Sequence, residues 1–440
     1  MRSKPRLQHL GASMLALGTV LPGMAHAQQA SASWVAPLTS ISETAAQEGI
    51  TFNSQYVGEF ATNPTGGMKT GSAYTGQLNV GSDVDLAQLA AIPGASFHVN
   101  FTDRAGTSLA SKWLNNSVSV QQVYGAGMTW QLSLLTYEQK FGSFADVVIG
   151  RDDVDNSFIG YDFLCDFQSN ASCGNTGILG KDTSIDFNPV PVWGGRIKIT
   201  PTDNLYAETG LYQSSSALKP PANHGFNWGT KNSNGYDWPI EAGYVSTTPG
   251  ATEQNKYDIG AIFDRVNFSA PYYQAGSANQ FGRTLLYAQA QQMVYQFSPN
   301  SPRGIYLFGV AMYSPDGQKQ VAQYSIEGGV SLQGPFAARP RDTLGLMASD
   351  VHYNSDFLTS LYNARLNAGG SGKPHSDMTM IELNYAAQVT PWLNIMPNLQ
   401  YVINPDGLGG GGLPLHNEKS AVVFGVQFAF DVAKFTGAAS

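Results

Sequence analysis

The chain has 440 residues, of which 48 are glycine, two are cysteine and only 13% are charged, whereas soluble domains carry roughly 25% charged residues and about 7% glycine. The 42% hydrophobic content excludes a disordered chain, and the absence of any apolar run of about 18 residues after residue 27 excludes helices that span a bilayer. Low charge, abundant glycine and 11% aromatic residues in such a chain predict an all-β fold, a transmembrane antiparallel β-barrel.

Residues 1–27 have the pattern of a secretory signal peptide. Arg2, Lys4 and Arg6 precede an apolar stretch that is too short to span a bilayer, and an A-x-A motif predicts cleavage after Ala27. An uncleaved anchor is the alternative, which the short apolar stretch disfavours. Removal of three of the 24 basic residues leaves 21 against 32 acidic residues, a net charge of −11. This acidic balance argues against nucleic acid as a partner.

A short N-terminal periplasmic segment is expected over residues 28–49. Residues 41–49 form its only plausible helix, and a mobile leader is the alternative. We expect the barrel to occupy residues 50–435 as one domain and residues 436–440 to form a tail.

Apolar and polar residues alternate with period two along most of this barrel region. The clearest examples are residues 97–102, 381–390 and 422–430. A half-buried soluble sheet gives the same alternation, but here the polar faces carry few Lys or Glu residues and the pattern recurs to the end of the chain. The alternation therefore predicts strands between a lipid belt and a polar lumen.

The connections between the alternating segments are of two kinds. Proline-containing short turns are expected at residues 199–205, 297–300 and 389–393. Longer loops rich in Gly, Ser, Asn and Pro are expected at residues 214–237, 368–376 and 404–417. With about 25 residues for each strand and its connections, the chain predicts about 16 strands, enough to enclose a water-filled channel.

The two cysteines, Cys165 and Cys173, enclose seven residues. In an exported protein such a pair is expected to form a disulfide that closes a loop. No metal-binding spacing of histidines and no G-x-S-x-G motif occurs. We therefore expect no catalytic residues, no metal and no cofactor, although Ser, His and Asp residues from distant strands could still converge.

Several motifs resemble the carbohydrate-selective porin family, the OprB-type porins. They lie at residues 49–50, 63–67, 74–76, 85–86, 94–99, 150–153, 165–168, 171–175, 341–345, 400–405 and 421–425. The resemblance implies a 16-stranded barrel in the outer membrane of a Gram-negative bacterium that passes glucose and related sugars passively. It also implies contact with outer-membrane lipid, lipopolysaccharide and the barrel-assembly machinery.

The C-terminus departs from the usual pattern of outer-membrane barrels, which commonly end on an aromatic residue. Here Phe435 is followed by five further residues, and it is out of phase with Phe430. Assembly would then read Phe430 or Phe435 internally, or the tail would be trimmed.

Residues 150–196 concentrate charges of both signs in a chain that is otherwise poor in charge. We expect this region to fold into the lumen, where charged groups would hydrogen-bond sugar hydroxyls and an aromatic ring would stack on the sugar. The candidate residues are Arg151, Asp152, Asp153, Asp162, Asp166, Trp193 and Arg196. The alternative is an extracellular loop whose acids bind divalent ions between lipopolysaccharide molecules.

Other functions stay open from the sequence alone. One is a general or organic-acid porin of the same size, and another is a soluble exported β-rich protein that binds or hydrolyses glycans. The preferred sugar, the choice between monomer and homotrimer, and the loop that forms the constriction are also left open.

Overall fold

The computed structural model describes residues 32–160, 163–173, 177–231, 233–269, 279–410 and 412–438. The signal peptide, its cleavage after Ala27 and the last two residues of the tail lie outside these ranges. Among the described helices, none has both the length and the apolar character needed to cross a membrane.

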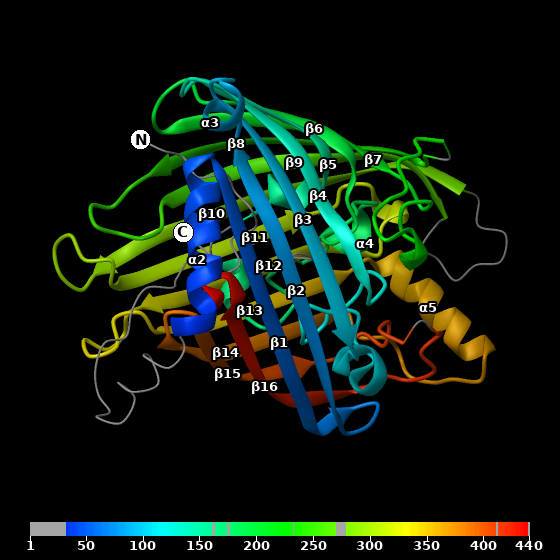
Figure 1. Ribbon diagram of the computed structural model, residues 1–440. Helices are drawn as coiled ribbons and strands as arrows, with labels where there is room; N and C mark the ends of the chain where they lie inside the picture. Colours follow the sequence, from blue (N-terminus) through cyan, green and yellow to red (C-terminus); the bar gives the residue numbers. More distant parts are fainter. Residues whose placement is uncertain are drawn as a thin grey trace.

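The described residues contain sixteen antiparallel strands that pair in chain order, and the first strand pairs with the last, which closes the barrel (Figure 1). The strands are β1 Ile50–Gly67, β2 Gly71–Asp85, β3 Ala95–Gly106, β4 Trp130–Phe141, β5 Ala145–Asp152, β6 Val192–Ile199, β7 Leu205–Ser214, β8 Gly235–Ser246, β9 Asn255–Ser269, β10 Asn279–Gln296, β11 Gly304–Tyr313, β12 Ala322–Gln333, β13 Thr343–Tyr353, β14 Asp377–Thr390, β15 Leu393–Ile403 and β16 Lys419–Asp431. Closure leaves no unpaired sheet edge, as a strand fold in lipid requires. The predicted fold class is confirmed.

The outer face of the barrel is apolar because period-two alternation sends every second side chain outward. Phe424 is 51% exposed while its neighbour Val423 is fully buried, and Leu383 is 45% exposed while Glu382 is 1% exposed. Phe101 and Thr102 show the same contrast. The predicted alternation is confirmed in all three segments.

The two rims of the barrel differ in the length of their connections. The turns expected near residues 200–204, 297–303 and 391–392 all lie on one rim. The start of β1 and the end of β16 lie on the same rim. The opposite rim carries the longest connections, at residues 107–129, 153–191, 215–234, 354–376 and 404–418. We call these the short-turn rim and the long-loop rim.

The helices lie at the rims or inside the ring (Figure 1). They are α2 Ala32–Gln47, α3 Leu86–Ala90 and α6 Val432–Thr436 at the short-turn rim, α5 Ser355–Asn367 at the long-loop rim, and α4 Leu179–Asp182 inside the ring. Short 3₁₀ or π turns occur at Ala110–Leu114, Val154–Asn156, Leu164–Asp166, Pro221–Asn223 and Gly317–Lys319.

The helix expected at residues 41–49 of the N-terminal segment is present, but it begins earlier than expected. Most of that segment lies within the longer α2, and α5 is a second helix of substantial length. The side chain of Asn354 caps α5 by accepting hydrogen bonds from the backbone of Asp356 and Phe357. This N-cap is a local signal that the sequence carried.

The change of phase at the C-terminus is explained by the end of the last strand. β16 ends at Asp431, whose side chain caps α6 by accepting a hydrogen bond from Lys434 N at 2.8 Å. The chain then turns, and Phe435 packs on Trp392 and Phe430 at ring distances of 4.9 and 5.1 Å. Phe435 is therefore out of phase because it is helical.

Candidate functional site

We call the connection between β5 and β6, residues 153–191, the inner loop, and its described residues (153–160, 163–173 and 177–191) fold into the barrel. Its aromatic side chains pack on the inner wall of β11: the Phe163 ring lies 4.6 Å from Tyr306, and Phe167 lies 5.7 Å from Phe308. β11 is apolar on both faces, which is unusual for a porin wall because the inner face normally meets water. The inner loop covers that face and buries it.

The tip of the inner loop is closed by the disulfide between Cys165 and Cys173, as predicted. We call residues 165–173 the tip. It contacts the wall formed by β14 and β15, where Asn384 Nδ2 donates to the Asp166 carbonyl at 2.9 Å and Asn398 Nδ2 donates to Gln168 Oε1 at 2.7 Å. The loop therefore crosses the lumen from β5 to a distant part of the wall.

A second connection, residues 107–129, joins the inner loop inside the barrel. Gln122 N donates to the Gln168 carbonyl at 2.9 Å, and Asn170 N donates to the Ser119 carbonyl at 2.8 Å. These backbone bonds tie the two connections together. Gln400 Nε2 on β15 donates to the Val120 carbonyl at 3.1 Å, which places the second connection against the inner wall as well.

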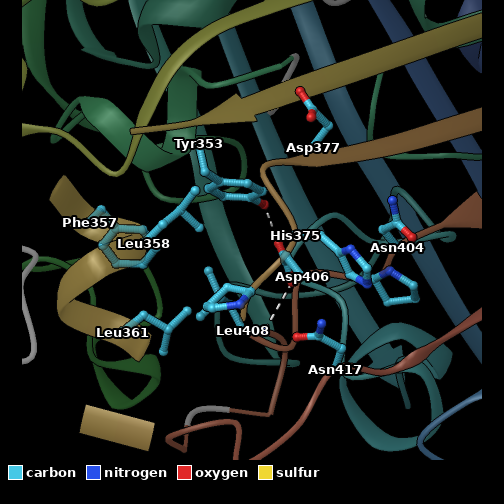
Figure 2. Close-up of a pocket in the computed structure, with 12 residues that line it drawn as sticks. Tyr353, Phe357, Leu358, Leu361, His375, Asp377, Asn404, Asp406, Leu408 and Asn417 are labelled. Atoms are coloured by element: carbon cyan, nitrogen blue, oxygen red, sulfur yellow. Dashed lines mark hydrogen bonds between the residues drawn. The ribbon is translucent and has the colours of Figure 1, made fainter. Parts of the chain in front are cut away.

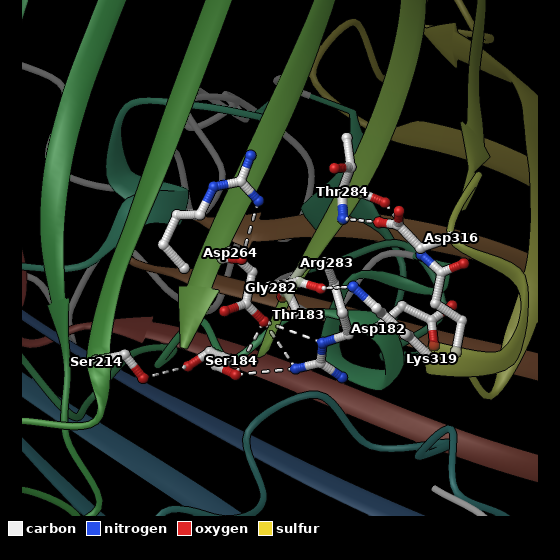
Figure 3. Close-up of polar contacts among 12 residues, drawn as sticks. Asp182, Thr183, Ser184, Ser214, Asp264, Gly282, Arg283, Thr284, Asp316 and Lys319 are labelled. Atoms are coloured by element: carbon white, nitrogen blue, oxygen red, sulfur yellow. Dashed lines mark hydrogen bonds and ion pairs between the residues drawn. The ribbon is translucent and has the colours of Figure 1, made fainter. Parts of the chain in front are cut away.

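The returning arm of the inner loop is held by polar contacts (Figure 3). Asp264 Oδ2 accepts from Arg283 Nη2 at 2.8 Å and from Ser184 Oγ at 3.0 Å. Asp182 accepts from Val321 N at 2.8 Å, which ties α4 to the connection before β12. Burial raises the pKa of Asp182 to about 6.

A charged strip runs along the inner wall from β5 to β9. It consists of Asp146, Arg196, Lys198, Glu208, Glu241, Lys256 and Asp258. In strand register Asp146 lies opposite Lys198, Lys198 opposite Glu208 and Glu208 opposite Glu241. Charges on adjacent strands are therefore lateral neighbours.

The members of the strip neutralise one another by ion pairs. Lys198 Nζ lies 3.1 Å from Glu208 Oε1, and Lys256 Nζ lies 3.1 Å from Asp258 Oδ2 and 3.7 Å from Glu241 Oε1. Arg196 pairs with Asp146 and lies 3.7 Å from Glu208. With three cationic and four acidic side chains, the strip is close to electrically balanced.

Four of the predicted site residues lie inside the barrel. Arg196 belongs to the charged strip, and Asp166 belongs to the tip. Asp152 accepts from Asn156 Nδ2 at 2.6 Å at the start of the inner loop. Asp153 follows it, fully buried, and burial together with neighbouring Asp155 raises its pKa well above the usual range. Asp162 lies outside the described residues.

Arg151 and Trp193 are corrections to the expected site, because both side chains point to the outer face. Arg151 shares its strand face with Ile149, which is 54% exposed, and it pairs in register with Trp193. Its guanidinium lies 5.7 and 5.5 Å from the rings of Trp193 and Trp228 and donates to the Asn227 carbonyl at 2.7 Å. Strand parity removes these two residues from the lumen.

Sequence reasoning missed Glu208, Glu241 and Lys256 as inner-wall residues, and it placed Glu382 on a polar strand face without foreseeing its contact with the tip. A usable signal existed for Glu241, which stands at an inward position between the outward apolar residues Ile240 and Ala242. The signal for the folded-in loop was the apolar run of β11, which needs a cover on both faces.

A shallow hollow lies apart from the strip, at the long-loop rim between α5 and residues 404–408 (Figure 2). Tyr353, Phe357 and Asp406 line part of it. Asp406 already accepts from the Tyr353 hydroxyl at 2.6 Å and from Leu408 N at 2.9 Å. These bonds fasten the rim loops to one another.

A closed barrel of sixteen strands, with an apolar outer belt, a charged inner wall and loops folded inward, defines the class of outer-membrane porins. This architecture points to a channel rather than an enzyme. Residues 69–431 match the family described as carbohydrate-selective porin, OprB family, and the chain belongs to that family.

Individual relatives agree with this assignment. The chain is 29% identical over 392 residues to Porin B of Pseudomonas aeruginosa, an alignment that covers 82% of this chain and 84% of the relative. It is 25% identical over 391 residues to the putative porin QuiX of Acinetobacter baylyi, covering 82% and 86%.

Solved structures give the same result. The high-pH structure of Pseudomonas putida OprB matches with a TM-score of 0.80 and 25% identity, over 88% of this chain and 95% of that chain. An anion-selective porin from Comamonas acidovorans shares the fold, with a TM-score of 0.50, 14% identity and coverage of 87% and 99%. The protein is a sugar-selective porin of the Gram-negative outer membrane.

Proposed function

We propose that the charged strip and the inner loop together form the constriction at which a sugar is recognised during passive diffusion, without a catalytic step. The observation that carries the proposal is the lateral row of Asp146, Lys198 and Glu208, which places donors and acceptors side by side on the lumen wall. A sugar hydroxyl both donates and accepts, so it matches such a row.

The near balance of charge in the strip favours a neutral permeant over an organic acid. A channel for carboxylates would concentrate cationic groups along its path, whereas here acids slightly outnumber bases. A few hydrogen bonds at one level of the pore also allow release, which conduction requires.

Planar-bilayer conductance with added glucose tests this proposal. We expect glucose to block the wild-type channel, and we expect Lys198→Met and Glu208→Gln to weaken the block. Lys434→Met is the matched control, since this lysine lies in α6 at the short-turn rim with a 43% exposed side chain. Unchanged block in both strip variants would remove the strip from the sugar path.

The remaining partners are proposals of the same kind. Lipid and lipopolysaccharide are proposed to contact the exposed apolar belt of the outer face. The barrel-assembly machinery is proposed to read the aromatic cluster of Trp392, Phe430 and Phe435. A homotrimer is proposed as the alternative to a monomer, and the mass of the detergent-extracted channel distinguishes them.

A further inference from the structure

A carboxylate on the opposite wall accepts two of the hydrogen bonds that hold the tip of the inner loop, beside the amide contacts of Asn384 and Asn398. Glu382, on the inner face of β14, accepts Gln168 N on Oε1 at 2.8 Å and Ser169 N on Oε2 at 2.9 Å. Both donors lie inside the ring closed by the disulfide. The inner loop begins at the end of β5, and β14 lies seven strands away from β5 around the ring. The loop that makes these two bonds therefore crosses the lumen.

This contact differs in kind from the apolar packing of the same loop. Packing of Phe163 and Phe167 on β11 is not directional, so it tolerates sliding of the loop. Two backbone N–H groups bonded to the two oxygens of one carboxylate fix both the position and the rotation of the tip.

The burial of Glu382 shows why the contact persists. Its side chain is 1% exposed, and its inward neighbours along β14 are Met380 and Asn384. A carboxylate buried there without donors would be strongly unfavourable. The tip supplies two donors, which compensate the burial of this carboxylate while the tip stays on the wall.

A second acid on the inner wall provides a contrast. Glu327, on β12, is equally buried, yet neither of its carboxylate oxygens accepts a hydrogen bond within the described part of the chain. Glu382 and Glu327 thus share residue type, strand face and burial. They differ in whether they hold the loop.

We infer that Glu382 is a positioning residue for permeation: it clamps the disulfide-closed tip across the lumen and thereby sets the width and the sugar selectivity of the channel. This inference rests on the proposed constriction, because Glu382 is one of the contacts that place the inner loop in the lumen, where the loop also meets the charged strip. Glu382 itself contacts the tip and need not contact the sugar.

Single-channel conductance and glucose block of the full-length protein test the inference. Glu382→Gln keeps the size of the side chain but turns an N–H₂ group toward one of the two donors, so the clamp is lost. We expect higher conductance and weaker glucose block. Glu382→Asp keeps both acceptor oxygens and is expected to retain more of the block than Glu382→Gln. Glu327→Gln is the matched control and is expected to leave both values unchanged.

A second variant approaches the clamp from the donor side. Ser169→Pro removes the N–H group that donates to Glu382 Oε2. Residue 169 lies in the loop and takes no part in strand pairing, so the barrel should still close, and the conductance should rise as in Glu382→Gln. Heat-dependent mobility on gels verifies that each barrel has closed. The inference is overturned if Glu382→Gln and Ser169→Pro barrels both conduct and bind glucose like wild type. The separate failure of the proposed constriction would appear as unchanged block in Lys198→Met.

Discussion

Lys198 and Glu208 face one another across β6 and β7, with Nζ 3.1 Å from Oε1 and the same ammonium 3.8 Å from the centre of the Tyr206 ring. The pair joins cationic and acidic members of the strip at one level of the lumen. Each charge is held in place by its neighbour, so removal of one partner exposes the other to the pore.

The first prediction concerns ion selectivity. Glu208→Gln leaves Lys198 and Arg196 without this carboxylate, so the channel should shift toward anions, whereas Lys198→Met should shift it toward cations. Reversal potentials in a KCl gradient measure both shifts. Shifts of the same sign in the two variants would show that the strip does not face the ion path.

The second prediction concerns pH. Burial raises the pKa of Asp155 to about 7, so this carboxyl is neutral in the folded protein below that pH. Because its pKa is raised, its contribution to stability is fully present below its ordinary pKa and is lost as the pH rises through about 7. Above about pH 7 the Asp155 carboxyl carries a negative charge inside the barrel. We therefore expect greater cation selectivity at pH 8 than at pH 5, and a smaller change with pH in Asp155→Asn. Equal pH responses of the two proteins would contradict this role.

The third prediction concerns the packing of the inner loop on β11. Phe163→Ala removes the ring that contacts Tyr306 and Phe308, which should cost about 3–5 kcal/mol of loop docking. Limited proteolysis should then cut the inner loop while the barrel stays closed. Phe424→Ala, on the lipid-facing side of β16, is the control and should leave the loop protected. Equal protection of both variants would count against the packing.

The fourth prediction separates Arg151 from the sugar path. Because its guanidinium lies between Trp193 and Trp228 on the outer face, Arg151→Ala should leave glucose block unchanged. It should instead loosen residues 215–234, since the bond to the Asn227 carbonyl is lost. Faster hydrogen exchange in that connection checks the second effect. Weakened glucose block would restore Arg151 to the constriction.

The fifth prediction concerns the disulfide. Replacement of Cys165 and Cys173 by Ser should leave the barrel folded, because the closed strand ladder does not depend on the tip. The tip itself gains conformational freedom, so glucose block should weaken in part while Glu382 still accepts its two bonds. Conductance recorded before and after reduction of the wild-type protein gives an independent measurement.

The sequence by itself determined the barrel, the lipid and lumen faces of its strands, the short turns and the disulfide. Each of these depends on local chemistry: period-two alternation, turn residues, and two close cysteines in an exported chain. The inward direction of Arg196 also followed, because Ile197 and Ile199 mark the lipid side of the same strand.

Only the tertiary structure decided which charges meet. The density of charge around residues 150–196 drew attention away from strand parity, which puts Arg151 and Trp193 on the outer face, and only the fold reveals that Asn227 and Trp228 contact Arg151 there. The contact of Glu382 with Gln168 joins residues 214 positions apart. Such a pairing exists only once the barrel has closed and the loop has crossed the lumen, and no local pattern encodes that closure.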